Sequence, residues 1–249
     1  MVLDVCYRFL PKRVTLRGAE VMDHFGIDYE VGENVIAEGV ELPLERGDVV
    51  CFVGDSGSGK SSLLRTAGEL LDDVLVMSEV EFPEATLIDG LGMSVQEGME
   101  LLSACGLGEA RLMLRYPSEL SDGERYRYRL ALSLARQPEW IVADEFTSSL
   151  DRVLAKVIAR NVRLMAGKKG IGFLVATTHE DVLSGLAADV VVRCRVGRDC
   201  EVICQREESG DSQKKSGSVL RKNCGSVRGV DPTGRISLGG IIDRTQRVM

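Results

Sequence analysis

The chain alternates between short apolar runs and stretches in which apolar residues recur at helical spacing. Continuous runs rich in β-branched residues predict buried strands at 48–53, 73–80, 140–143, 171–177 and 190–194. Helical spacing predicts helices over 63–71, 94–105, 107–114, 153–165 and 180–186, and over a segment of about 125–137 that Pro138 ends. Strands that alternate with helices predict an α/β domain with a mainly parallel sheet covered on both faces.

The amino-terminal segment has a different pattern. Apolar and polar residues alternate over 2–20 and again over 35–42, and a turn-rich stretch, H-F-G-I-D-Y-E-V-G-E-N, separates them. Alternation with a period of two predicts half-buried strands. We therefore expect an antiparallel β edge that leads into the strand at 48–53.

The periodicity ends near the carboxyl end of the chain. From Glu207 onward the sequence is rich in Ser, Gly, Lys and Arg, as in S-G-D-S-Q-K-K-S-G-S. Such a segment buries too little apolar surface to form a core. We predict one domain over 1–204 and a disordered basic tail over 205–249, or a segment that orders only against a partner.

Charge is distributed unevenly. The tail has nine Lys or Arg and five Asp or Glu, a net +4, so the remainder has 22 against 33, or −11, from totals of 31 and 38. An acidic body is not typical of a nucleic-acid-binding surface. The tail's modest excess is compatible with contact to an anionic partner and also with plain solvation.

The composition, 44% hydrophobic and 28% charged, is that of a globular protein. No apolar run reaches the roughly 18 to 20 residues that span a bilayer, and the start of the chain lacks the pattern of a signal peptide. We expect a cytoplasmic protein, with any membrane-spanning part supplied by a partner. Seven cysteines without close C-x-x-C pairs predict reduced thiols, and Cys194, Cys200 and Cys204 favour strand packing over a metal site.

A glycine-rich motif follows the strand at 48–53. Residues 54–61 read G-D-S-G-S-G-K-S, which fits glycine, four residues, glycine, lysine, serine, and a helix follows directly. The alternative is a glycine-rich turn with a chance lysine, but the strand and helix on either side favour a phosphate-binding loop. The predicted nucleotide contacts are Gly54, Asp55, Ser56, Gly57, Ser58, Gly59, Lys60, Ser61 and Ser62.

The glycines let backbone N–H groups converge on an anion, the helix N-terminus adds its dipole, and Lys60 adds positive charge. Ser61 is the predicted hydroxyl ligand of Mg²⁺. A loop of this kind serves kinases, GTPases and many ATPases, so it leaves the reaction open.

Three further polar residues follow predicted strands. Asp144 and Glu145 come directly after the strand at 140–143, and His179 follows the strand at 171–177. We predict that Asp144 holds Mg²⁺, that Glu145 acts on the attacking water, and that His179 senses the terminal phosphate. The alternatives are solvated loop acids or a helix cap for the pair, and an ordinary histidine for His179.

At residues 120–124 the sequence reads L-S-D-G-E, which resembles the signature loop L-S-G-G-Q of the ABC ATPases. The resemblance continues through R-Y-R-Y-R-L-A-L-S-L-A-R-Q-P to A-D-E-F-T-S-S-L-D and covers about residues 25–195. It implies a P-loop NTPase of the ABC type, with a mainly parallel sheet, an antiparallel β edge and a short helical subdomain. The sequence also resembles soluble ABC-type ATPases of archaea and bacteria, some of which are fused to an acetyltransferase domain. Residues 205–249 contain no acetyl-CoA loop of such a domain.

By this resemblance, two copies pair head to tail around ATP, as a homodimer or with a related ATPase. Ser121 and Gly123 would contact the terminal phosphate of ATP bound to the other copy, and Asp151 would lie in the D-loop between the two sites. A second helix N-terminus would thus close a phosphate site that one copy leaves open. Hydrolysis would then release the dimer.

The sequence departs from the family pattern at several positions. Asp122 replaces a glycine and Glu124 a glutamine, so the signature is unusually acidic, and Phe146 stands where a proline normally follows the catalytic glutamate. The span between Lys60 and Ser121 is short for a transporter subunit.

Two roles of the family have no clear residue here. Gln96 is misplaced for the Q-loop glutamine, and the turn before it offers Glu79 and Glu81 instead. The aromatic residue that stacks on adenine is Phe25 or Tyr29, although each is also a candidate core residue.

The leading hypothesis is a soluble ABC-type ATPase that binds and hydrolyses ATP with Mg²⁺ and opens and closes a dimer. One alternative is the nucleotide-binding subunit of a membrane transporter. Another is an ATP-gated binding switch with little turnover, which the presence of Glu145 disfavours. The process driven, the partner and the role of the tail are left open, and so is any membrane or nucleic-acid partner.

Overall fold

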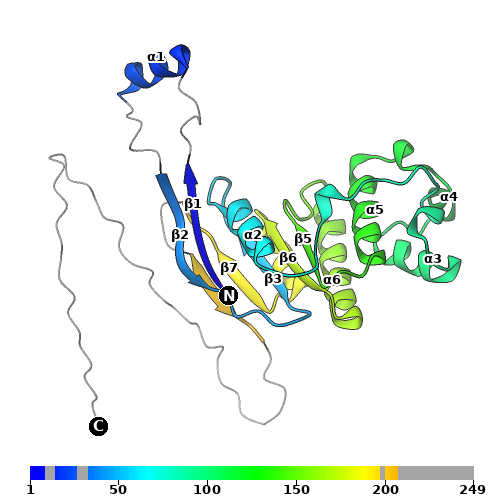
Figure 1. The fold of residues 1–249 in the computed structure, drawn as a ribbon. Helices are drawn as coiled ribbons and strands as arrows, with labels where there is room; N and C mark the ends of the chain where they lie inside the picture. The colour runs from blue at the N-terminus through cyan, green and yellow to red at the C-terminus, as the bar shows by residue number, and fades with distance from the viewer. Residues whose placement is uncertain (9–14, 27–32, 197–199, 207–249) are drawn as a thin grey trace, which may run out of the picture.

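A six-stranded, mainly parallel sheet forms the centre of the molecule (Figure 1). The computed structural model describes residues 1–8, 15–26, 33–196 and 200–206. The strand order is β4-β5-β6-β3-β7-β8, and β8 alone pairs antiparallel, with β7. The strands are β3 Val49–Val53, β4 Val74–Val76, β5 Trp140–Ala143, β6 Gly172–Thr177, β7 Val190–Arg193 and β8 Glu201–Cys204. The predicted α/β class is confirmed, and the antiparallel edge of this sheet is β8.

Successive residues of each strand point to opposite faces, so the sheet has two separate apolar cores. On one face, residues such as Cys51 and Phe173 pack with the helices α5, α6 and α7. On the other, Phe52 and Leu174 pack with α2 and with the strands β1 and β2. The helices are α2 Lys60–Glu69, α3 Val95–Ala104, α4 Ala110–Met113, α5 Asp122–Ala135, α6 Arg152–Lys169 and α7 Leu183–Leu186.

The amino-terminal strands form a sheet of their own. β1 (Val2–Arg8) pairs antiparallel with β2 (Glu33–Glu41), and neither is hydrogen-bonded to the six-stranded sheet. The predicted antiparallel pairing is confirmed, but the pair is a separate sheet and not an edge of the six-stranded one. They lie over one face of the sheet, where Leu3 and Val40 pack into the core.

The prediction of strand as far as residue 20 was also wrong, because Leu16–Phe25 forms the helix α1. The Thr15 side chain accepts a hydrogen bond from the Gly18 N–H at 3.0 Å, and Gly26 ends the helix in a left-handed conformation with φ of 62°. These two caps decide the local structure, since Met22 is the only buried residue of the helix. α1 lies beyond the end of the β1–β2 pair, away from the main sheet (Figure 1).

The helical subdomain contains α3, α4 and α5, and it projects to one side of the sheet (Figure 1). Alternate arginines of R-Y-R-Y-R, on α5, bind backbone carbonyls of neighbouring segments. Arg127 donates to the Gly106 carbonyl and, within its own helix, to the Gly123 carbonyl, and Arg129 donates to Val80 O at 3.2 Å. Because each guanidinium spans two segments, α5 is the element around which the other segments of the subdomain are fixed.

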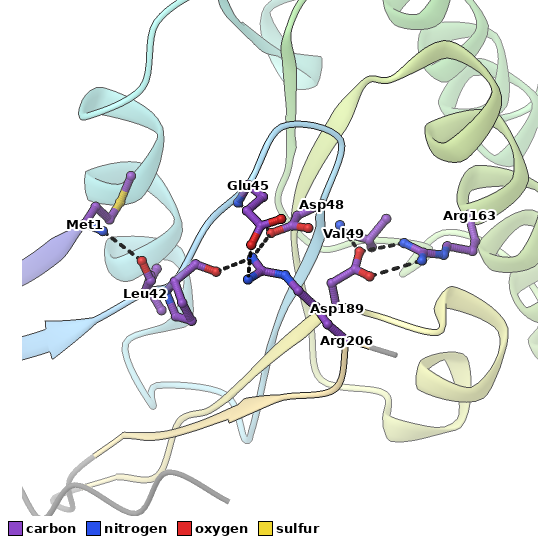
Figure 2. A network of polar contacts seen from close by, with 9 residues as sticks. Met1, Leu42, Glu45, Asp48, Val49, Arg163, Asp189 and Arg206 are labelled. Carbon is purple, nitrogen blue, oxygen red and sulfur yellow. Dashed lines mark hydrogen bonds and ion pairs between the residues drawn. The ribbon is translucent and has the colours of Figure 1, made fainter. Parts of the chain in front are cut away.

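Charged groups tie the segments together at the amino ends of the strands (Figure 2). Asp189, just before β7, accepts the Val49 N–H at 2.8 Å and pairs with Arg163 of α6 at 2.6 and 3.1 Å. Asp48, just before β3, accepts the Glu45 N–H at 2.7 Å and pairs with Arg206. We predicted that Gln205 and Arg206 belong to the tail. In the structure both are bound to the folded body, since the Gln205 N–H donates to Asp189 O and Arg206 pairs with Asp48.

Asp189→Ala should lower the free energy of unfolding by about 1–3 kcal/mol, because it leaves the Val49 N–H and the Arg163 guanidinium without their shared acceptor. Urea unfolding measures the change. Arg46→Ala is the control, since Arg46 is 74% exposed and lies 3.9 Å from Glu139. Its loss should cost under about 1 kcal/mol. Equal losses of stability in the two variants would contradict the conclusion that Asp189 stabilises the fold through its contacts with Val49 and Arg163.

Candidate phosphate-binding and catalytic site

The glycine-rich loop runs from the end of β3 to the start of α2, as the sequence predicts. All five residues of β3 are buried, so the strand holds the loop on a rigid base. Leu63, Leu64 and Ala67 of α2 are buried against the sheet, which fixes the direction of the helix. Gly59 is the N-cap of α2, and it has no side chain to cap the helix, so the first N–H groups of the helix are left for an anion.

Three glycines give the loop its shape. Gly54, Gly57 and Gly59 have φ of 155°, 78° and 87°. A Cβ at Gly54 would lie 2.1 Å from the backbone oxygen of Cys194, and one at Gly59 would lie 2.2 Å from Cγ2 of Ile36 on β2. Neither contact is possible for a real Cβ, so both positions require glycine for space as well as for conformation.

The polar groups of the loop fit a phosphate chain. Lys60 is 8% exposed, and its Nζ donates to the Asp55 carbonyl at 2.6 Å, which curls the lysine back over the loop. Ser58 Oγ is buried and has no hydrogen-bond partner among the described residues. The buried Ser58 hydroxyl without a partner and the Lys60 ammonium group held at the loop both favour an anionic ligand there.

Gly54→Ala should lower the free energy of unfolding by more than Gly57→Ala. An alanine at either position should destabilise the fold by about 1–2 kcal/mol, because the backbone there is in the left-handed region. Only Gly54 adds a clash with a backbone oxygen, while the space around Gly57 is open within 4 Å. Urea unfolding of the two variants tests the ranking, and equal losses would contradict the proposed close approach to Cys194.

The second part of the site lies at the end of β5. β5 pairs with β6 on one side and with β4 on the other, and Asp144 and Glu145 follow its last residue, Ala143. Both acids are exposed, and Asp144 Oδ1 accepts the Glu145 N–H at 2.9 Å. The Asp144 carboxylate and the Ser61 hydroxyl are oxygen ligands of the type that Mg²⁺ takes, with phosphate oxygens and water completing its shell. The donor set therefore fits a magnesium ion shared with a nucleotide.

β6 lies between β3 and β5, so its carboxyl end separates the loop from the acidic pair. His179 follows this end, and its backbone N–H donates to Thr177 Oγ1 at 3.1 Å. Parallel strands end at the same edge of a sheet, so the fold places Lys60, Asp144, Glu145 and His179 on one edge. The fold thus brings these four sequence-predicted candidates to one edge of the sheet.

Three ion pairs hold the segment after His179, the short helix η5 (Glu180–Val182), and one of them joins Lys156 to Asp181 at 3.7 Å. Arg152 of α6 binds Asp181 through both carboxylate oxygens and holds the pKa of that carboxyl below its usual range. Arg193 of β7 pairs with Glu180 at 3.3 Å. These ion pairs were not predicted from the sequence. The signals were Arg152, directly after Asp151, and the acids Glu180 and Asp181, directly after His179.

The signature loop forms the N-terminus of α5. The Ser121 hydroxyl accepts the Glu124 N–H at 3.4 Å, and the Glu124 carboxylate accepts the Ser121 N–H at 2.8 Å and its hydroxyl at 2.7 Å. This reciprocal capping box explains the departure from glutamine, because a carboxylate accepts both donors and favours the positive end of the helix dipole. The two hydrogen bonds from Ser121, first of all the one from its backbone, lower the pKa of Glu124.

Glu124→Gln should destabilise the protein at neutral pH by about 0.5–1 kcal/mol through loss of the charge near the helix N-terminus. The native pKa of Glu124 lies below its ordinary value of 4.5, so this stability is present above that value and is lost as pH falls through the native pKa. Urea unfolding should therefore give a gap between the two proteins that closes on acidification. A gap that is constant down to pH 3 would contradict the charge-based explanation.

The D-loop contacts the signature within the same chain. Asp151 caps α6, since its Oδ1 accepts the Val153 and Leu154 N–H groups at 3.0 Å each. A Cβ at Gly123 would lie 3.3 Å from Ser149 O, so the signature helix rests closely on this loop. Of the two candidate adenine-stacking residues, Phe25 is 71% exposed on α1, and Tyr29 lies outside the described residues.

The strand, glycine loop and helix, with acids two strands away, define a P-loop NTPase with an extra strand between the two motifs. Comparison of the chain with known proteins identifies the family. No protein-family model matches the chain. A lipoprotein-releasing system ATP-binding protein LolD of Novosphingobium aromaticivorans is 31% identical over 205 residues, which cover 65% of this chain and 88% of LolD. An aliphatic sulfonates import ATP-binding protein, SsuB 2 of Nocardia farcinica, is 34% identical over 189 residues, covering 67% and 77%. The chain belongs to the ABC ATPase family.

Larger proteins match over part of their length. The macrolide export ATP-binding/permease protein MacB of Rhodopirellula baltica is 29% identical over 235 residues, and the chain spans 34% of its length. Among solved structures, a dimeric ATP-binding cassette with bound ADP and phosphate has a TM-score of 0.56 at 21% identity, covering 71% of this chain and 94% of that one. This likeness confirms the fold of an ABC ATPase domain.

The finer resemblance to soluble ATPases that are not transporter subunits finds no support among these relatives, whose names all refer to transport or release systems. The same holds for a fused acetyltransferase domain. In the ranges that the structure describes, no helix is long and apolar enough to cross a membrane.

Proposed function

We propose that this chain binds ATP with Mg²⁺ and hydrolyses it to ADP and phosphate. The observation that carries the proposal is the shared edge of three adjacent strands. β3 leads into the glycine loop, β6 leads to His179, and β5 leads to Asp144 and Glu145. Phosphoryl transfer depends mainly on positioning and on electrostatic stabilisation, and this edge supplies groups for both.

Each group has a defined task. The loop amides and Lys60 bind the phosphate chain, and the glycines at 54, 57 and 59 keep side chains out of its way. Ser61 and Asp144 would hold Mg²⁺, which would neutralise charge on the phosphate oxygens. Glu145 orients the attacking water and accepts its proton, and His179 donates a hydrogen bond to the terminal phosphate.

We further propose that two copies pair head to tail, with ATP between the loop of one and Ser121 and Gly123 of the other. Within one chain the signature lies on the helical subdomain and the loop lies on the sheet, so each copy carries two separate half-sites. Asp151, which caps α6 beside the signature, would lie between the two nucleotides. A solved cassette of the same fold is a dimer with bound ADP and phosphate.

Glu145→Gln should trap the ATP-bound dimer, because the amide keeps the shape of the side chain but accepts no proton from water. Multi-angle light scattering in Mg-ATP should give twice the mass of one chain, and phosphate release should fall by at least about 100-fold, within the range that a general base contributes. Lys60→Ala in the same background is the control and should stay monomeric. A Glu145→Gln protein that stays monomeric in saturating Mg-ATP would contradict the head-to-tail site.

The relatives favour a second candidate, the ATP-binding subunit of a transport system. In that case a membrane protein would associate with the chain, and the chain would sediment with membranes of its source cells. Recovery only in the soluble fraction would favour a soluble ATPase, and a cytoplasmic location suits either case. An ATP-gated switch with little turnover stays an untested alternative, which a measured rate of phosphate release would decide.

A further inference from the structure

The turn that carries Glu145 has an unusual backbone. Glu145 and Thr147 have φ of 49° and 62°, in the left-handed region, and neither is a glycine. A β-branched residue in this region is a true outlier, because its side chain crowds the backbone. Such a conformation persists only when surrounding contacts hold it, and outliers of this kind gather at functional sites.

Backbone hydrogen bonds within the turn join the Ser148 N–H to Glu145 O and the Leu150 N–H to Thr147 O, and three further hydrogen bonds involve Phe146 and Thr147. The Phe146 N–H, beneath a completely buried ring, donates to Ala176 O of β6 at 2.7 Å, a bond that a proline at this position could not make. The hydroxyl of Thr147, also completely buried, donates to Phe146 O at 2.6 Å. The Thr147 N–H donates to the phenol oxygen of Tyr126 at 3.0 Å. Of these partners, Tyr126 alone comes from the signature helix.

Tyr126 is well placed to transmit a shift of α5. It lies five residues after Ser121 on this helix, and its ring packs against the buried core of the sheet. Burial raises the pKa of its phenol, so the oxygen that receives the Thr147 N–H is neutral. The same helix touches the loop a second time, where Gly123 approaches Ser149.

We propose that Tyr126 is a positioning residue for Glu145. Its hydrogen bond to Thr147 keeps the left-handed turn in the geometry that aims Glu145, and it links that geometry to the helix whose N-terminus carries Ser121. This inference rests on the proposed ATPase function. It predicts that Tyr126 contributes to the rate of the chemical step and not to nucleotide affinity.

Tyr126→Phe removes the phenol oxygen and keeps the ring. The expected result is a fall in kcat of at least tenfold, with KM for ATP and the Kd of a fluorescent ATP analogue within twofold of the native values. Tyr128→Phe is the matched control, two residues along the same helix. Tyr128 is completely buried, and its phenol oxygen has no hydrogen-bond partner in the described part of the chain, so this variant should keep the native kcat.

A Tyr126→Phe protein with native kcat would overturn the proposal, as would an equal loss in both variants. Hydrogen exchange gives a test that needs no turnover. The Thr147 amide should exchange slowly in the native protein and at least tenfold faster in Tyr126→Phe, with the Tyr128→Phe protein unchanged. Rapid exchange in the native protein would overturn the proposal even if the variant failed to fold. A native protein without ATP hydrolysis would contradict the proposed function instead, and the exchange experiment would then decide the hydrogen bond's role in holding the turn.

Discussion

The register of three buried parallel strands is the constraint on which the site depends. β6 pairs with β3 on one side and with β5 on the other, from Val49 opposite Phe173 to Ala143 opposite Val175. Every residue of these strands is buried, so a slip of one residue would move each side chain to the opposite face and disrupt the packing of both cores. Because the register cannot slip, the ends of the strands keep their relative heights. The relative positions of the glycine loop, the acidic pair and the histidine are therefore fixed by the backbone pairing of these strands.

The features that could be predicted from sequence depend on local signals. The glycine loop has its own spacing, β5 is an uninterrupted apolar run before two acids, and Pro138 ends the helix of the signature. Predicted strand 140–143 agrees with β5, and the helix at 94–105 agrees with α3 to within one residue. In each case the residues that determine the element lie within it, so no knowledge of distant partners is required.

The features that could not be predicted depend on contacts between distant segments or on hydrogen bonds made by individual capping side chains. β8 is four residues long and becomes a strand only by pairing with β7, and α1 is set by two caps within an alternating pattern that favours strand. The roles of Glu124 and Tyr126 were hidden for the same reason. Glu124 is an apparent defect in the signature until its hydrogen bonds to Ser121 are seen, and Tyr126 acts on a residue 21 positions away.

The network of Asp48, Asp189, Arg163 and Arg206 lies at the amino ends of the strands, while every proposed nucleotide contact on the sheet lies at the carboxyl ends (Figure 2). Substitutions that tune thermal tolerance can therefore be chosen at one edge without altering the chemistry of the other. Stability and the proposed chemistry thus depend on different groups, at opposite ends of the same strands.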